Sequence, residues 1–140
     1  IQLNEKEQTI KQRLSDLEYR TTYCVVCEAD LFGKRYVKLG NEVKGELAAS
    51  GCNFVDNPTS PDIVIRIHAS ARKYNEFQGA YFTYIDAAVT IDKTATGQRI
   101  FEDELSTKGS HTLGYDEAAR DGYKQIKKDI VKQLKENIKL

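Results

Sequence analysis

The residues best suited to acid–base chemistry in this sequence are His68 and the run Glu102-Asp103-Glu104. A histidine titrates near neutral pH, and two carboxylates can divide the work of general acid and general base. Successive side chains of a strand point to opposite faces, so only Glu102 and Glu104 can share a face. No serine or cysteine has a spacing that ties it to His68 as a nucleophile. We therefore expect no catalytic residue, and keep a small-ligand or hydrolase-like site at His68, Glu102 and Glu104 as the alternative.

The segment Cys24-Val25-Val26-Cys27 has the spacing of a redox dithiol. Such a site needs its first cysteine at a helix N-terminus, whereas these β-branched neighbours predict a strand, in which residues three apart face opposite ways. Buried, inert thiols are the favoured interpretation, and a bridge from Cys24 or Cys27 to Cys52 stays open. The cysteines and the histidines, His68 and His111, lack the paired spacings of a zinc site. We therefore expect neither a metal nor a cofactor.

The composition narrows the classes of partner. The chain has 140 residues, 40% of them hydrophobic and 30% charged, with Lys plus Arg and Asp plus Glu both at 21. Balanced charge supplies no field for nucleic acid, and no apolar run approaches the ~20 residues of a membrane-spanning helix. The sequence begins at Ile1 and contains no methionine, so we expect a processed piece with a leader, lipid anchor or further domain upstream.

The elements that must position these residues are predicted from hydrophobic periodicity. The pattern gives the order α-β-α-β-β-β-β-α. This order predicts an α/β fold, a mixed and mainly antiparallel sheet of about five strands with helices packed on it. Residues 1–18 form the first helix, which could pair with another helix or connect to an upstream region. Residues 19–140 form a single α/β domain. Breaks in the sheet are expected at Lys73–Gly79 and Lys108–His111, and a helix from Asp116 closes the chain.

Aromatic residues gather where the predicted loop at Lys73–Gly79 meets the next strand. Large aromatic side chains outside a core usually serve recognition, because they bury much area for little lost rotamer freedom. Tyr81 and Phe82 point to opposite faces of that strand, so one side of the sheet cannot bury both. We expect a protein-binding patch here, although two helix-covered sheet faces would also explain the group. The predicted binding residues are Tyr74, Phe77, Tyr81 and Phe82.

Three segments resemble the TolB amino-terminal-like domains, the curli-secretion lipoprotein and the penicillin-binding-protein activator lipoproteins. The first, residues 47–55, is the end of a helix followed by small residues and a strand. The second, residues 61–67, is an apolar strand. The third, residues 89–100, is a pair of strands joined by a Thr-Gly turn. The resemblance covers roughly residues 36–134. It departs from those families at Pro61, where alanine is usual. The resemblance implies a non-catalytic protein-interaction or assembly domain in the periplasm or at the outer membrane. Its partner would be another envelope protein or a second copy of the chain.

Overall fold

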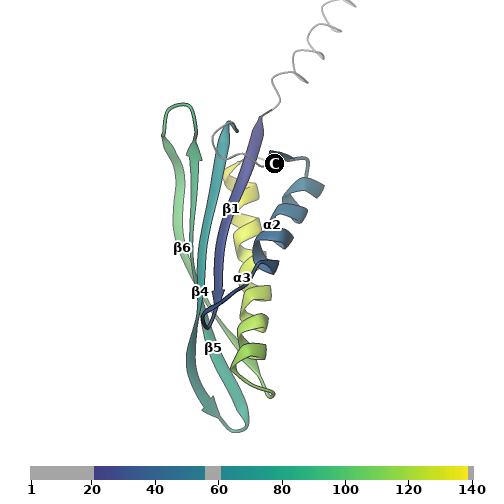
Figure 1. Ribbon diagram of the computed structural model, residues 1–140, viewed down its shortest axis with the longest axis vertical. Coiled ribbons are helices and arrows are strands. Elements are labelled where there is room, and N and C mark those ends of the chain that lie inside the picture. Colours follow the sequence, from purple (N-terminus) through teal and green to yellow (C-terminus); the bar gives the residue numbers. More distant parts are fainter. Residues whose placement is uncertain (1–20, 56–60, 139–140) are drawn as a thin grey trace, which may run out of the picture.

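The computed structural model describes residues 21–55 and 61–138, which form a six-stranded sheet and two helices (Figure 1). The predicted helix over residues 1–18 lies outside the described residues. The elements are β1 (Thr22–Leu31), β2 (Lys34–Arg35), α2 (Lys38–Ala49), β3 (Asn53–Phe54), β4 (Ile63–Phe77), β5 (Ala80–Lys93), β6 (Arg99–His111) and α3 (Tyr115–Asn137). The predicted fold class, a mixed and mainly antiparallel sheet with helices packed on it, is confirmed.

The strands follow the order β2-β1-β4-β5-β6, and β3 pairs with β1 off this path. β1 and β4 are parallel, because α2 lies between them in the chain and provides the crossover that parallel neighbours require. β4, β5 and β6 form an antiparallel meander. Its turns contain Gln78-Gly79 and Gly97, all at positive φ, as the predicted Thr-Gly turn requires. The meander leaves β6 at the edge of the sheet.

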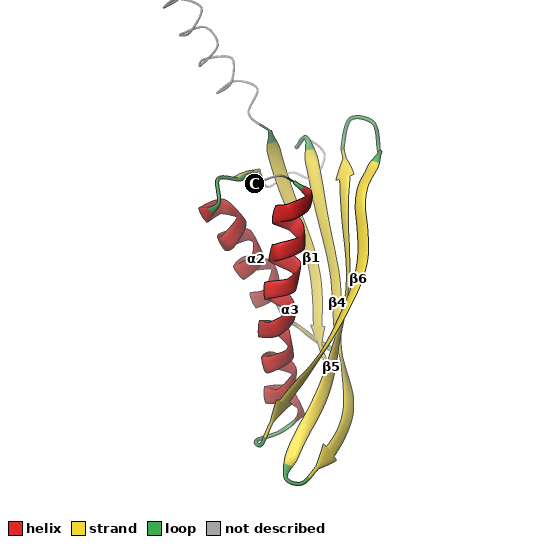
Figure 2. Ribbon diagram, turned by 180° about the vertical axis from the view of Figure 1, so that it is seen from behind, coloured by secondary structure: helices red, strands yellow, loops and turns green. Residues whose placement is uncertain are grey.

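Both helices pack on one face of the sheet, and the opposite face carries no helix from the described part of the chain (Figure 2). The strands turn alternate apolar residues toward the helices. An apolar stripe of α3 packs against them: Ala119, Tyr123, Ile126, Ile130 and Leu134 are buried, and Ile138 is half-buried. The main core therefore lies between the sheet and the helices. On the other face Cys24 and Val64 are buried at one end, and the rest of that face is half-buried or exposed.

Gly109 of β6 and Gly122 of α3 lie against each other and set how closely α3 crosses the sheet. A Cβ atom at Gly109 of β6 would overlap the Ala118 carbonyl and the backbone of Gly122 on α3. A Cβ atom at Gly40 of α2 would likewise lie 2.8 Å from the Cys27 Cβ. The absence of a side chain at Gly40 therefore allows α2 to approach the sheet closely. At Gly45 nothing lies within 4 Å of the position of an added Cβ.

Both predicted breaks in the sheet are wrong. β4 continues to Phe77 with a bulge between Lys73 and Asn75, because pairing with β5 satisfies the backbone of these polar residues. β6 likewise continues to His111. Gly109 does not interrupt the strand but lies inside it, where the approach of α3 leaves no room for a side chain. Gly109, which the sequence pattern placed in a break of the sheet, is therefore a point of contact between β6 and α3.

Candidate functional site

Side chains on the open face of the sheet form rows that cross the strands. The register places Glu28, His68, Ala88 and Glu104 opposite one another, from β1 to β6. Neighbouring strands lie about 4.8 Å apart, so His68 and Glu104 flank Ala88 with their Cα atoms roughly 10 Å apart. The next row along the strands contains Asp30, Ser70, Asp86 and Ser106. Acidic, imidazole and hydroxyl groups are therefore collected from four strands.

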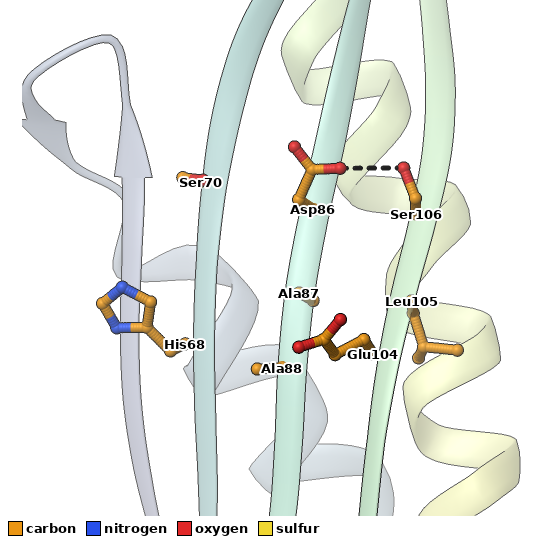
Figure 3. Close-up of a pocket in the computed structure, with 8 residues that line it drawn as sticks. All are labelled: His68, Ser70, Asp86, Ala87, Ala88, Glu104, Leu105 and Ser106. Carbon is orange, nitrogen blue, oxygen red and sulfur yellow. Dashed lines mark hydrogen bonds between the residues drawn. The ribbon is translucent and has the colours of Figure 1, made fainter.

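A hollow of about 510 Å³ opens over the alanine in the middle of these rows (Figure 3). It forms because the methyl group of Ala88 is shorter than the side chains on either side. The Ser106 hydroxyl donates a hydrogen bond of 2.9 Å to Asp86 Oδ1 across it. The Glu104 carboxylate has no ion-pair partner within residues 21–55 and 61–138. The polar residues of the lining are His68, Ser70, Asp86, Glu104 and Ser106.

His68 lies between two such hollows and meets one carboxylate. Its Nδ1 atom is 3.4 Å from Glu28 Oε2, with the two side chains 74% and 71% exposed. A second hollow, of about 380 Å³, lies on the β1 side and includes Glu28, Asp30, Arg35 and His68. An exposed pair of this kind contributes little to stability, because water and salt screen it. His68 and Glu28 are therefore both accessible to a molecule bound over this face.

The basic residues of the open face are mostly paired with neighbouring acids. Asp92 accepts from Arg66 at 3.3 Å and from Arg99 at 3.0 Å, and Arg99 also lies 3.4 Å from Glu102. The hydrogen bond from Arg99 to Asp92, with the charge of that carboxylate, raises the pKa of the guanidinium. Arg72 pairs with Asp86 at 3.3 Å. These pairs leave the Glu104 carboxylate as the uncompensated charge of the hollow.

The alternative site predicted at His68, Glu102 and Glu104 is brought together only in part. His68 and Glu104 line the same hollow, whereas Glu102 lies one pleat farther along β6 and pairs with Arg99. Sequence reasoning missed Asp86 and the two serines of the lining. The signal was present, since these residues occupy alternate positions of the same strands, but which of them face one another depends on strand register.

The aromatic residues predicted to bind divide between the two faces. Tyr81 packs edge-on against Tyr115 of α3, with ring centroids 5.0 Å apart. Phe82 lies on the open face beneath the Lys108 ammonium group. Tyr74 and Phe77 are 55% and 60% exposed near the end of the β4–β5 hairpin. Three of the four predicted residues therefore share the open face, and Tyr81 belongs to the helix side.

Tyr84 joins this aromatic group and was missing from the predicted binding residues. Its ring lies 5.0 Å from the Tyr74 ring in an edge-to-face arrangement. The Arg72 guanidinium lies 4.8 Å from its centroid on the same face. Tyr84 lies two residues after Phe82 along β5 and therefore shares its face. We call Tyr74, Phe77, Phe82 and Tyr84 the aromatic end of the open face.

The three cysteines lie apart in the fold. Cys24 and Cys27 point to opposite faces of β1, as predicted for residues three apart in a strand. Cys52 precedes β3, whose register with β1 places it beside the start of that strand. Cys52 packs in the helix-side core, whereas Cys24 faces the open side and Cys27 lies about 20 Å along β1. A disulfide needs Cα atoms within about 7 Å, so the alternative that was left open, a bridge from Cys24 or Cys27 to Cys52, is wrong.

The half-buried thiol of Cys27 gives a pH-dependent prediction. Desolvation, with a smaller contribution from Glu28, raises its pKa from 9.0 to about 11. As the pH rises, the unfolded chain therefore loses this proton before the folded protein does. The contribution of the protonated thiol to the free energy of unfolding is complete below pH 9.0 and is lost as the pH rises toward about 11. We expect the free energy of unfolding of the wild type to fall relative to Cys27→Ala over this window. Urea denaturation at a series of pH values measures it, and a constant difference between the two proteins would contradict it.

Neither a metal cluster nor a membrane-spanning helix is found in the part of the chain that the structure describes. No group of three or more His, Cys, Asp or Glu side chains there is arranged to hold a metal ion. None of its helices is both long enough and apolar enough to cross a bilayer.

Solved structures share this fold at low sequence identity. The hypothetical protein CT253 from Chlamydia trachomatis matches with a TM-score of 0.61 and 9% identity, over 84% of this chain and 97% of that one. Lipoprotein GNA1162 from Neisseria meningitidis gives a TM-score of 0.55 and 11% identity, over 81% and 97%. PelC from Paraburkholderia phytofirmans, a dodecamer, gives 0.51 and 12%, over 76% and 86%. No protein-family model and no curated protein sequence matches the chain. The chain therefore shares its fold with these structures, one of which is a bacterial lipoprotein.

Proposed function

We propose that this chain is a non-catalytic protein-binding domain of a bacterial cell-envelope protein or lipoprotein, located in the periplasm or at the outer membrane. The fold shared with a meningococcal lipoprotein and with dodecameric PelC supports an envelope role in which domains assemble with one another. The resemblance to TolB amino-terminal-like domains and to the curli-secretion and penicillin-binding-protein activator lipoproteins belongs to this proposal. The partner is another envelope protein or a second copy of the chain.

The observation that carries the proposal is the exposed aromatic end of the open face. The β4–β5 hairpin extends past the helix layer in both views (Figures 1 and 2), so the described helices leave its tip uncovered. Tyr74 and Phe77 accordingly remain more than half exposed. Tyr74 is nonetheless held in place by its contact with Tyr84, which Arg72 also covers. Ordered, exposed aromatic rings bordered by cations are typical of the centre of a protein interface.

Replacing Tyr74 and Phe77 together with serine tests the proposal. Both side chains are exposed, so the free energy of unfolding should change by no more than about 1 kcal/mol. Capture of the partner from detergent-solubilised envelope, measured by quantitative mass spectrometry, should fall strongly, because the anchors of the interface are removed. A reversible thermal or urea unfolding curve for each variant measures the stability, so that loss of capture is not mistaken for loss of folding.

Val37→Ser provides the matched control, since Val37 is 60% exposed, like Phe77, but lies at the start of α2. This variant should capture the same proteins as the wild type. If the Tyr74/Phe77 double variant also captures them undiminished, the aromatic end is not the binding surface. If it unfolds, the two residues belong to the core and the patch does not exist.

The hollow over Ala88 supports a second candidate, a small-ligand site. Carboxylates at Asp86 and Glu104, with the imidazole of His68, could accept hydrogen bonds from hydroxyl or ammonium groups of a bound molecule. A thermal-shift screen against metals, nucleotides and glycans separates the two functions, because a ligand that binds the native state raises the melting temperature. Saturable stabilisation that Glu104→Gln abolishes would favour this candidate over the protein-binding role.

A further inference from the structure

The two edges of the sheet are protected to very different degrees. At one edge, β1 is covered by the short strands β2 and β3. At the other, β6 presents the 13 residues of Arg99–His111, with no strand of the described chain on its outer side. An exposed edge offers a row of unpaired backbone N–H and C=O groups to another strand. β6 is therefore the place where the sheet could be extended.

Two hydrogen bonds reveal which amides of β6 point outward. The Glu104 N–H donates to Asp103 Oδ1 at 2.8 Å, and the Ser110 N–H donates to Asp121 Oδ2 of α3 at 3.1 Å. These amides bond to side chains and so do not take part in the ladder with β5. In an antiparallel strand the direction of the amide alternates, so Ser106 and Lys108, between them, also direct their N–H groups outward.

Two side chains of opposite charge lie at equal distances along β6 on the two sides of Ser106. Glu104 and Lys108 lie two residues to either side of it, with both side chains on the open face. Neither charge forms an ion pair with any residue of the described chain. A strand that runs antiparallel to β6 with the same sequence would bring each of them opposite the other.

We infer that β6 pairs with the β6 strand of a second copy, antiparallel and about a two-fold axis at Ser106. Ser106 then lies opposite the partner's Ser106, and Glu104 lies opposite the partner's Lys108 in both halves of the interface. The match is self-complementary, as an isologous contact requires, which favours a second copy over an unrelated strand. The inference deepens the proposed assembly role and rests on it.

The helix side of β6 fits the same arrangement. α3 crosses β6 at Gly109 and then leaves it toward β1, in both views (Figures 1 and 2). The N-terminal half of β6 consequently keeps Phe101 and Leu105 only half-buried. The proposed register places the partner's Gly109 opposite Asp103, so the partner's α3 lies beside these two apolar residues. Each copy would thus cover apolar surface that the other leaves open.

A charge exchange between the two positions tests the register. Lys108→Glu and Glu104→Lys should each weaken dimer formation at least about tenfold in sedimentation velocity over a concentration series, because like charges then face each other twice. The double variant, with both changes, should return to within about threefold of the wild type, since opposite charges are restored with their places exchanged. Lys34→Glu, an exposed change on the opposite edge, should leave association unchanged.

A cysteine at the axis gives an independent readout. Opposed residues in a hydrogen-bonded antiparallel pair have Cα atoms about 5.5 Å apart, which suits a disulfide. Ser106→Cys should therefore form a covalent dimer under mild oxidation. Ser70→Cys, on the same face but on the interior strand β4, should not. Wild-type protein controls for the native cysteines.

The inference is overturned if the wild type stays monomeric throughout, if the double charge variant does not recover, or if Ser70→Cys cross-links as well as Ser106→Cys. Partner capture separates this failure from failure of the proposed function. Capture that still depends on Tyr74 and Phe77 while the wild type stays monomeric would leave the protein-binding role intact and remove only the β6 pairing.

Discussion

Gly109→Ala is expected to destabilise the domain by at least ~3 kcal/mol, or to prevent folding. The added methyl group would overlap the Ala118 carbonyl and the Gly122 amide, and would lie 2.9 Å from the Gly122 Cα. All three contacts are with backbone, so no side-chain rotation can relieve them. α3 would have to move away from β6, and its packing on the sheet would loosen with it. Urea denaturation followed by circular dichroism measures the loss.

Gly45→Ala is the matched control for this prediction. Gly45 lies inside α2, nothing lies within 4 Å of the position of its added Cβ, and its φ is not positive. Alanine should therefore stabilise the domain by roughly 0.5–1 kcal/mol, because it restricts the unfolded chain more than glycine does. Equal effects of the two substitutions would show that the crossing at Gly109 is not as close as the structure has it.

Tyr123→Ala is expected to cost about 3–5 kcal/mol, as is typical when a large buried aromatic side chain is truncated. The Tyr123 side chain is fully buried in α3, and its ring stacks on Tyr36 with centroids 4.4 Å apart. Its hydroxyl donates a hydrogen bond to the Asp30 carbonyl of β1. One residue therefore ties the last helix to the first strand and to the segment before α2. The free energy of unfolding from urea titration is again the measurement.

Tyr123→Phe divides this cost into its parts. Phenylalanine keeps the stacking on Tyr36 and removes only the hydrogen bond to Asp30, so we expect a loss of about 1 kcal/mol. A phenylalanine variant as unstable as the alanine variant would show that the hydrogen bond, and not the buried ring, dominates at this position. An alanine variant close to the wild type would contradict the burial of the side chain.

The candidate site shows how far strand periodicity can be trusted. Alternation along one strand is a local property, so it correctly separated Glu102 and Glu104 from Asp103 and Tyr81 from Phe82. Which residues face one another across strands depends on register, and a shift of one residue would reverse the face of every side chain. The hollow over Ala88 exists only because the register places a small residue between His68 and Glu104. No single strand contains that information.

By itself, the sequence determined the α/β class, the mainly antiparallel sheet and the helix that closes the chain, because each of these follows from a periodicity within single segments. Within residues 21–55 and 61–138, tertiary structure alone decided that β6 is an edge, that no helix covers the second sheet face, and that Gly109 is a helix contact and not a break. These properties depend on where segments distant in the chain meet. The backbone of Gly122 on α3, and not the neighbours of Gly109 in sequence, is what leaves that glycine no room for a side chain.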